Sequence, residues 1–387
     1  MIKRTLSEKI ETLIGGNKAI IIKGPRQVGK STLLNNLFAN KKDVMFLNGD
    51  EMDVRLLFEN ISSTRLSAVI GKNKILVIDE AQRIENIGLK LKLITDNIND
   101  VQVIATGSSS FNLASKVNES LAGRKREFKM FGLSFAEMVN HTSLLIEKRM
   151  IPQRMLFGYY PEVVTNKGEE KAVLKELVDS YLYKDILTLD SIKKSEKLIR
   201  LVQALALQIG SQVSYNELSN LVGLDQKTVE KYIDILEKSF IVFRLSSFSR
   251  NARNELKMSR KIYFYDNGIR NAVLGNFSQI ESRLGSEVGA LWENYLVSER
   301  VKYNAYRGFY GTSWFWRTQQ QKEIDYLEDE DGILSAYEFK WNSKVRAKIP
   351  KQFSETYKNY IFKEITPENI EEFLLFLRNL DFIPKIL

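Results

Sequence analysis

A glycine-rich segment, residues 24–31, constrains the fold of this chain more than any other feature of its sequence. It reads Gly-Pro-Arg-Gln-Val-Gly-Lys-Ser and matches the pattern G-x-x-x-x-G-K-[ST] at every fixed position. An apolar run, residues 19–23, precedes it, and a helical pattern starts at Ser31. The glycines let the backbone curl so that its N–H groups face a phosphate, and the helix N-terminus adds partial positive charge. This context favours a phosphate-binding strand–loop–helix unit over a glycine-rich loop with a chance lysine.

Four apolar runs alternate with helical patterns over the first part of the chain. They cover residues 19–23, 44–47, 75–78 and 101–105. Continuous apolar strands that alternate with helices are typical of a parallel sheet covered on both faces. We therefore predict an α/β P-loop NTPase domain over residues 1–150, with a ligand crevice at the carboxyl ends of its strands.

The predicted nucleotide site draws on three strand ends. Lys30 should reach the β- and γ-phosphates, and Ser31 should bind Mg²⁺. After the third run, Asp79 could hold Mg²⁺ through water and Glu80 could polarise the attacking water. After the fourth run, Ser108 could sense the γ-phosphate, and a simple helix cap is the alternative. The predicted nucleotide-binding residues are Gly24, Pro25, Arg26, Gln27, Val28, Gly29, Lys30, Ser31, Thr32 and Asp79.

The composition narrows the chemistry that this chain can support. The 387 residues include no cysteine and one histidine, His141, which excludes disulfides, thiolate zinc sites and multi-histidine metal centres. Any metal must therefore bind carboxylates, hydroxyls and phosphates, which favours Mg²⁺ or Mn²⁺. The net charge of +9 fits a polyanionic partner such as nucleic acid as well as an uncommitted basic surface. The absence of cysteine fits a reducing cytoplasm, where we expect the protein to reside. Because no apolar run approaches the roughly 18 residues of a membrane span, we expect no transmembrane helix and no membrane contact.

The middle of the chain has the pattern of a helix-turn-helix followed by a wing. Ser214 and Glu217 form an S-x-x-E capping box, Gly223 ends the first helix, and Asp225 caps a second helix that runs to Ser239. The apolar runs 241–245 and 261–264 could then pair as wing strands. We therefore predict a helical, winged-helix-like domain over residues 151–262.

Polar residues at the start of the second helix would face a DNA groove, and a basic loop would contact phosphates. The alternative is a helical packing module with a solvated basic loop. The helix residues are Gln226, Lys227, Thr228 and Lys231, and those of the loop are Arg250, Arg253, Lys257, Arg260 and Lys261.

The last third of the chain, residues 263–387, brings carboxylates and a lysine into one strand pattern. Alternation places Glu338 and Lys340 on one strand face, with Asp325 across a predicted hairpin, close enough to share a metal with Glu338. Glu293 lies on a small or apolar helix stripe and needs a partner, either the same metal or a structural salt bridge. We predict that Glu293, Asp325 and Glu338 bind Mg²⁺ for phosphodiester cleavage, with Lys340 orienting water or stabilising charge.

These motifs resemble the AAA+ superfamily ATPases of bacteria and archaea, of the AAA_14 type. The matching segments are residues 24–31, 78–82, 106–109, 121–124 and 133–137. The resemblance implies ATP binding and hydrolysis with Mg²⁺. It also implies that Arg124 supplies charge near a nucleotide, which could belong to a neighbouring subunit of a homo-oligomer. The alternative is that Arg124 belongs to a solvated basic run.

The C-terminal region resembles the DUF4143-type domain that is fused to these same ATPases and is similar to PD-(D/E)xK nucleases. The matching segments are residues 291–294, 323–326 and 338–340, with further matches at 158–162 and 264–268. Ile324 stands where the nuclease motif has proline. The resemblance implies a restriction-endonuclease-like α/β fold that acts on DNA. Two alternatives remain, a nucleotide-gated binding module with an inactive nuclease-like domain and a docking surface for acidic proteins or RNA.

Overall fold

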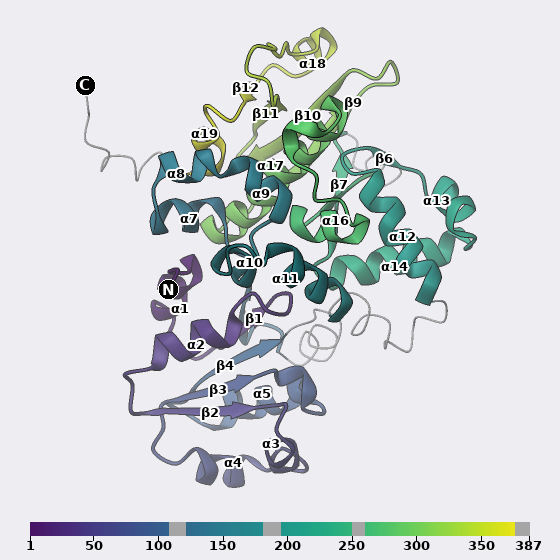
Figure 1. Ribbon diagram of the computed structural model, residues 1–387. Coiled ribbons are helices and arrows are strands. Elements are labelled where there is room, and N and C mark those ends of the chain that lie inside the picture. Colours follow the sequence, from purple (N-terminus) through teal and green to yellow (C-terminus); the bar gives the residue numbers. More distant parts are fainter. Residues whose placement is uncertain (108–120, 181–194, 250–259, 376–387) are drawn as a thin grey trace. The chain divides into compact units, whose positions relative to one another are not determined.

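Contacts within the chain divide it into two compact units, each with its own β-sheet. The first unit comprises Met1–Leu133 with Lys238–Phe240, and the second comprises Ser134–Glu237 with Ile241–Leu387. The computed structural model describes residues 1–107, 121–180, 195–249 and 260–375 (Figure 1).

The described sheet of the first unit has five strands, all parallel, in the order β2-β3-β4-β1-β5. This arrangement confirms the predicted parallel sheet. The edge strand β5 was not predicted, because its sequence, Lys-Arg-Glu-Phe-Lys, is charged rather than apolar, as edge strands often are. The strands are β1 (Ala19–Lys23), β2 (Val44–Asn48), β3 (Ile75–Asp79), β4 (Gln102–Gly107) and β5 (Lys125–Lys129).

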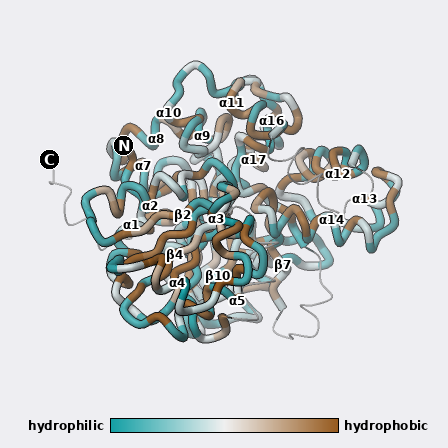
Figure 2. The backbone as a smooth tube through the Cα atoms, turned by 90° about the horizontal axis from the view of Figure 1, so that it is seen from below, coloured by the Kyte–Doolittle hydropathy of each residue, from teal (hydrophilic) through white to brown (hydrophobic). Residues whose placement is uncertain are grey.

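Both faces of this sheet are buried, which explains why its central strands are continuously apolar (brown in Figure 2). On one face, Ile21, Ile78 and Ala105 belong to a core that also includes side chains from α3, α4 and α5. On the other face, Ile22 and Ile104 are fully buried. The helices are α1 (Thr5–Glu11), α2 (Lys30–Phe38), α3 (Met52–Leu57), α4 (Ser63–Ile70) and α5 (Ile87–Asn97).

The second unit contains a mixed sheet of seven described strands in the order β12-β11-β10-β9-β7-β8-β6. The predicted wing strands β7 and β8 pair antiparallel, and β7 also pairs with β9. The sheet therefore continues across the predicted domain boundary at residue 262, which lies inside β8. The strands are β6 (Gln212–Val213), β7 (Val242–Ser247), β8 (Arg260–Phe264), β9 (Thr312–Arg317), β10 (Glu323–Glu330), β11 (Ile333–Phe339) and β12 (Tyr360–Ile365).

Helices precede and interrupt this sheet. Those before the first strand are α7 (Phe135–His141), α8 (Leu144–Arg149), α9 (Ile151–Phe157), α10 (Pro161–Thr165), α11 (Glu170–Leu177) and α12 (Ser195–Leu207). The others are α13 (Tyr215–Val222), α14 (Gln226–Lys238), α16 (Asn267–Leu274), α17 (Gly285–Arg307), α18 (Lys351–Thr356) and α19 (Glu371–Leu374). Within the part of the chain that the structure describes, no helix has the length and hydropathy to cross a bilayer.

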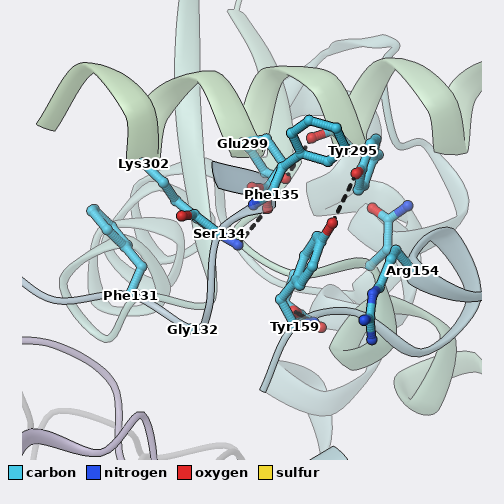
Figure 3. A network of polar contacts seen from close by, with 12 residues as sticks. Phe131, Gly132, Ser134, Phe135, Arg154, Tyr159, Tyr295, Glu299 and Lys302 are labelled. Atoms are coloured by element: carbon cyan, nitrogen blue, oxygen red, sulfur yellow. Dashed lines mark hydrogen bonds and ion pairs between the residues drawn. The ribbon is translucent and has the colours of Figure 1, made fainter. Parts of the chain in front are cut away.

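The long helix α17 is anchored by buried polar contacts (Figure 3). Lys302 donates to one oxygen of Glu299 at 2.6 Å, and the other oxygen accepts the N–H of Phe135 at 2.7 Å. The hydroxyls of Tyr159 and Tyr295 lie 3.0 Å apart. Because buried charges are tolerated only with partners, these contacts fix α17 against the start of α7 and the segment before α10.

Candidate functional site

The glycine-rich segment forms the loop between β1 and α2, as predicted. Gln27 and Gly29 have left-handed backbone angles, with φ of 59° and 89°. A Cβ atom on Gly24 would lie 2.0 Å from the carbonyl oxygen of Met130, so this position requires glycine. The loop is therefore curled and closely backed by the residue that follows β5.

Lys30 is the first residue of α2 and is 5% exposed. Its ammonium donates to the carbonyl oxygens of Gly24 at 3.1 Å and Pro25 at 2.7 Å, inside the loop. Burial lowers the pKa of Lys30 to about 8, and the negative charges of Glu80 and Asp79 oppose that shift. A phosphate placed in the loop would offer the ammonium stronger acceptors than these carbonyls.

The hydroxyl-bearing residues Ser31 and Thr32 follow Lys30 in the first turn of α2, and both are exposed. A hydroxyl at a helix start beside a phosphate loop can ligate Mg²⁺. The donor set that the sequence predicts for this ion, Ser31 with Asp79, consists of hard oxygen ligands, which suits Mg²⁺.

Asp79 and Glu80 lie at the carboxyl end of β3, beside the end of β4. The hydroxyl of Thr106, which is fully buried, donates to Asp79 Oδ1. The N–H of Glu80 is shared between Thr106 Oγ1 at 3.1 Å and Asp79 Oδ1 at 3.2 Å. Glu80 itself has a left-handed φ of 46°, and its carboxylate accepts a hydrogen bond from Gln82. This geometry fixes the direction of both carboxylates.

Thr106 is a site residue that the sequence analysis did not choose. The hydroxyl predicted to sense the γ-phosphate in this segment is that of Ser108, which lies outside the described residues. The available signal was that Thr106 directly follows the apolar run 101–105. Its contact with Asp79 depends on the pairing of β3 with β4, which the sequence does not state.

Arg124 is not brought near the loop within this chain. It precedes β5, and its carbonyl accepts the N–H of Ala19 at 2.9 Å, at the start of β1. The loop follows the carboxyl end of β1, so Arg124 lies at the amino ends of the strands, away from the loop. Its guanidinium pairs with Asp96 at 2.5 Å.

A second cluster lies in the other unit, where α17 faces β8 and β10. Carboxylate oxygens of Glu293, Glu323 and Asp325 all lie within 4.8 Å of one another. Lys261 is 1% exposed and donates to Glu293 Oε1 at 2.8 Å and to Glu323. The hydroxyl of Tyr263 donates to the same Glu293 oxygen at 2.6 Å. Glu323 was not among the predicted metal ligands. The prediction that Lys261 belongs to a basic loop that contacts phosphates is wrong, because Lys261 is buried in β8.

The predicted residues of β10 and β11 join this cluster. Asp325 Oδ2 accepts the N–H of Phe339 at 2.8 Å, next to Glu338, which pairs with Lys340 at 2.8 Å. Burial, followed by the negative charges of Glu293 and Glu338, raises the pKa of Asp325 well above its ordinary value. Burial also raises the pKa of Glu338. The structure therefore groups Glu293 and Asp325 with Glu323. Glu338, the third predicted metal ligand, pairs with Lys340 beside this group, and the metal-binding role of these residues stays a prediction.

A register shift in β10 helps to place Asp325. The pairing of β10 with β9 is irregular between Ile324 and Leu327. Such bulges re-aim side chains at the position where they occur.

The predicted helix-turn-helix segment forms helices α13 and α14. Gly223 ends α13 with a left-handed φ of 65°, and Asp225 accepts the N–H of Thr228 at 2.9 Å before α14. At the start of α14, Gln226 and Lys227 are exposed, as is Lys231 one turn later, whereas Thr228 is half-buried.

The basic residues around the predicted wing have carboxylate partners where they are described. Arg244 pairs with Asp234, and Arg260 lies 3.8 Å from Glu230. The predicted phosphate contacts at Arg250, Arg253 and Lys257 lie outside the described residues.

Comparison with protein families divides the chain in three. Residues 16–139 match the family described as an AAA domain. Residues 288–371 match a domain of unknown function, DUF4143, and residues 148–280 match another, DUF8612. The first two matches confirm the predicted resemblances at the level of the domain family. The similarity of the C-terminal domain to nucleases stays a prediction.

Relatives extend over most of the chain. An uncharacterized protein of Mycobacterium tuberculosis is 24% identical over 343 residues, covering 88% of this chain and 74% of the relative. An uncharacterized protein of Methanocaldococcus jannaschii is 24% identical over 369 residues, covering 89% and 80%. Among solved structures, a Walker-type ATPase of Pyrococcus abyssi has a TM-score of 0.49 at 15% identity, covering 71% of this chain and 96% of the other.

Proposed function

We propose that the first unit binds ATP with Mg²⁺ and hydrolyses it. The observation that carries this proposal is the buried ammonium of Lys30 inside a curled glycine loop, with Asp79 and Glu80 close enough to affect its pKa. The match of residues 16–139 to an AAA domain supports it.

The residues around the loop would have separate roles in binding and hydrolysis. Lys30 contacts the β- and γ-phosphates, where it neutralises charge that develops in the transition state. Ser31 and Asp79 hold Mg²⁺, Asp79 through water. Glu80 polarises the attacking water, and Thr106 keeps Asp79 oriented. Arg124 would act only on the nucleotide of a neighbouring subunit, since it lies at the amino ends of the strands in its own sheet and the loop lies at their carboxyl ends.

Equilibrium dialysis with labelled ATP tests this proposal. Lys30→Ala should abolish nucleotide uptake, because the loop then lacks its buried cation. Lys18→Ala, which removes an exposed lysine just before β1, is the matched control and should bind as the wild type does. Absence of uptake by the folded wild-type protein would contradict the assignment.

We also propose a second activity, metal-dependent phosphodiester cleavage, for the cluster in the other unit. The observation that favours it is the close grouping of carboxylate oxygens from Glu293, Glu323 and Asp325. The ion pair of Glu338 with Lys340 lies beside this group. Carboxylates suit Mg²⁺ or Mn²⁺, and a bound cation would lower the pKa of a water molecule. Lys261 already neutralises part of this charge, which is the feature that favours the alternative, a nucleotide-gated module that binds without cleaving.

A supercoiled plasmid separates these two functions. Nicking with Mg²⁺ or Mn²⁺ that is lost in Glu338→Ala would support cleavage. Glu330→Ala, which removes a more exposed carboxylate from the end of β10, is the control and should retain the activity. Absence of nicking with both metals, with and without ATP, would favour the binding module.

We propose DNA as the partner of the second unit, through the exposed start of α14. Lys227 and Lys231 present ammonium donors to solvent there, and the exposed Gln226 donates from Nε2 to Asn216 Oδ1 at 3.0 Å. Such side chains at the start of the second helix of a helix-turn-helix suit a DNA groove. RNA or an acidic protein is the competing partner, and salt-dependent binding measured with each polyanion distinguishes them.

A further inference from the structure

Arg4 is a buried arginine in the first unit that none of the predicted motifs includes. It immediately precedes α1, and it is 8% exposed. Its Nη1 donates to the carbonyl oxygen of Val28 at 2.6 Å. Its Nη2 donates to the carbonyl oxygens of Phe131 at 2.7 Å and Gly132 at 3.2 Å. One guanidinium therefore joins two segments that lie about a hundred residues apart in sequence.

These two segments are the phosphate loop and the end of the first unit. Val28 is a fully buried loop residue that lies between the two glycines of the motif. Phe131 and Gly132 follow β5, and the first of the two stretches that make up the first unit, Met1–Leu133, ends one residue later. The chain then continues into the second unit, whose first helix, α7, is capped by Ser134.

The other end of the loop contacts the same segment without Arg4. The N–H of Met130 donates to the carbonyl oxygen of Lys23 at 2.7 Å, and the Met130 carbonyl closely approaches Gly24. The loop is thus held against residues 130–132 at its start by main-chain packing and near its end by Arg4.

Arginine suits this position for a geometric reason. Its guanidinium is planar and presents five N–H donors in a fixed fork, so it can span carbonyls of two segments at once. Lysine carries the same charge as a point at the end of a flexible stem. It cannot maintain all three contacts in this arrangement.

We propose that Arg4 couples the phosphate loop to residues 130–132, so that nucleotide binding is transmitted to the segment that leads into the second unit. This inference rests on the proposed nucleotide site and adds a regulatory route to it. A phosphate bound in the loop restricts the motion of the Val28 carbonyl. Through the hydrogen bonds of Arg4, it also restricts the motion of the Phe131 and Gly132 carbonyls.

Hydrogen–deuterium exchange of the full chain tests this coupling. It is measured with and without Mg²⁺ and a non-hydrolysable ATP analogue, on peptides covering residues 24–34 and 128–136. In the wild type, the analogue should slow exchange in both peptides. In Arg4→Lys, the analogue should still protect the loop peptide, and its effect on residues 128–136 should be clearly smaller than in the wild type, with only the main-chain contact of Met130 left to transmit it.

Lys3→Ala is the matched control, because Lys3 is exposed and pairs only locally with Glu8 at 2.8 Å. It should retain both protections. A purely structural role of Arg4 would speed exchange with or without the analogue and leave the nucleotide-dependent difference intact, which would overturn the coupling. Arg4→Lys is preferred to Arg4→Ala because it keeps the charge, and its thermal unfolding is compared with that of the wild type. If the analogue protects neither peptide in the wild type, the nucleotide site fails together with the coupling.

Discussion

At the scale of single residues, Lys30 is a buried lysine whose positive charge the proposed binding of ATP requires. Its pKa of about 8 lies close to neutrality because burial disfavours the ammonium more than Asp79 and Glu80 favour it. In the free protein it is protonated below that pH and neutral above it. A polyphosphate binds the protonated form of Lys30. At a pH where Lys30 is neutral in the free protein, binding is therefore accompanied by proton uptake at Lys30.

We therefore expect nucleotide affinity to fall as the pH rises through 8. The dissociation constant of a non-hydrolysable ATP analogue should increase by about tenfold between pH 7 and pH 9, as the protonated fraction declines. Isothermal titration calorimetry measures both the constant and the proton uptake. Lys18→Ala should show the same slope, whereas a pH-independent constant in the wild type would exclude this role for Lys30.

Several residues of both sites could not be found from the sequence, and the reason is the same for each. The motif residues Lys30, Asp79 and Glu80 follow from local spacing. Thr106 and Lys261 do not, because their partners lie on other strands or helices. Their importance depends on which strands pair and on which side chains become buried, and neither property is local.

At the scale of elements, the sequence predicted most strands whose residues are buried on at least one face. The charged edge strand β5 was missed, as was β12, which is also at an edge. These two edge strands lack a continuous apolar pattern. The edge strand β2 was predicted, because its residues 44–47 form an apolar run. The antiparallel pairing of β10 with β11 followed from alternation and an acidic turn, whereas the irregularity near Asp325 depends on the third strand, β9.

The carboxyl group of Asp325 should make the second unit less stable at high pH. Its pKa is raised in the folded state, so its contribution to the free energy of unfolding is fully present at low pH and is lost as the pH rises through the folded-state pKa. Asp325→Asn cannot ionise. We expect this variant to be more stable than the wild type by about 1–3 kcal/mol near pH 8, with a smaller difference near pH 4.

Urea unfolding at a series of pH values, without divalent cations, measures this difference. Asp331→Asn, at an exposed turn position with a left-handed φ of 56° that asparagine tolerates, is the control. It should follow the wild-type curve. A stability difference for Asp325→Asn that does not change with pH would show that folding does not raise the pKa of Asp325.

The exposed lysines of α14 provide a test at the same scale. Replacing both Lys227 and Lys231 with alanine should weaken DNA binding and make its salt dependence shallower, because fewer phosphate counterions are released. Fluorescence anisotropy at several salt concentrations measures both quantities. Lys171→Ala, on the exposed face of α11, should change neither. An unchanged salt slope in the double variant would exclude α14 as a phosphate contact.

At the scale of the whole molecule, an ATP-bound state that does not turn over shows whether the two units act together. Glu80→Gln should bind ATP as tightly as the wild type and reduce its hydrolysis to background, since the neutral amide cannot polarise water. If nucleotide binding controls DNA binding, the DNA affinity of this variant in the presence of ATP should equal that of the wild type in the presence of a non-hydrolysable analogue. The wild type with ATP should not maintain that affinity, because it hydrolyses the nucleotide. Retained phosphate release by purified Glu80→Gln would remove Glu80 from its role.

The continuity of the second sheet has a practical consequence for dissecting this protein. Residue 262 lies within β8, whose hydrogen bonds to β6 and β7 join it to the helical segment and whose Lys261 reaches α17 and β10. A gene divided there would give two polypeptides, each with half a strand and an open row of amides and carbonyls. Both fragments should be prone to aggregation, so a C-terminal fragment should begin before β7 rather than inside β8.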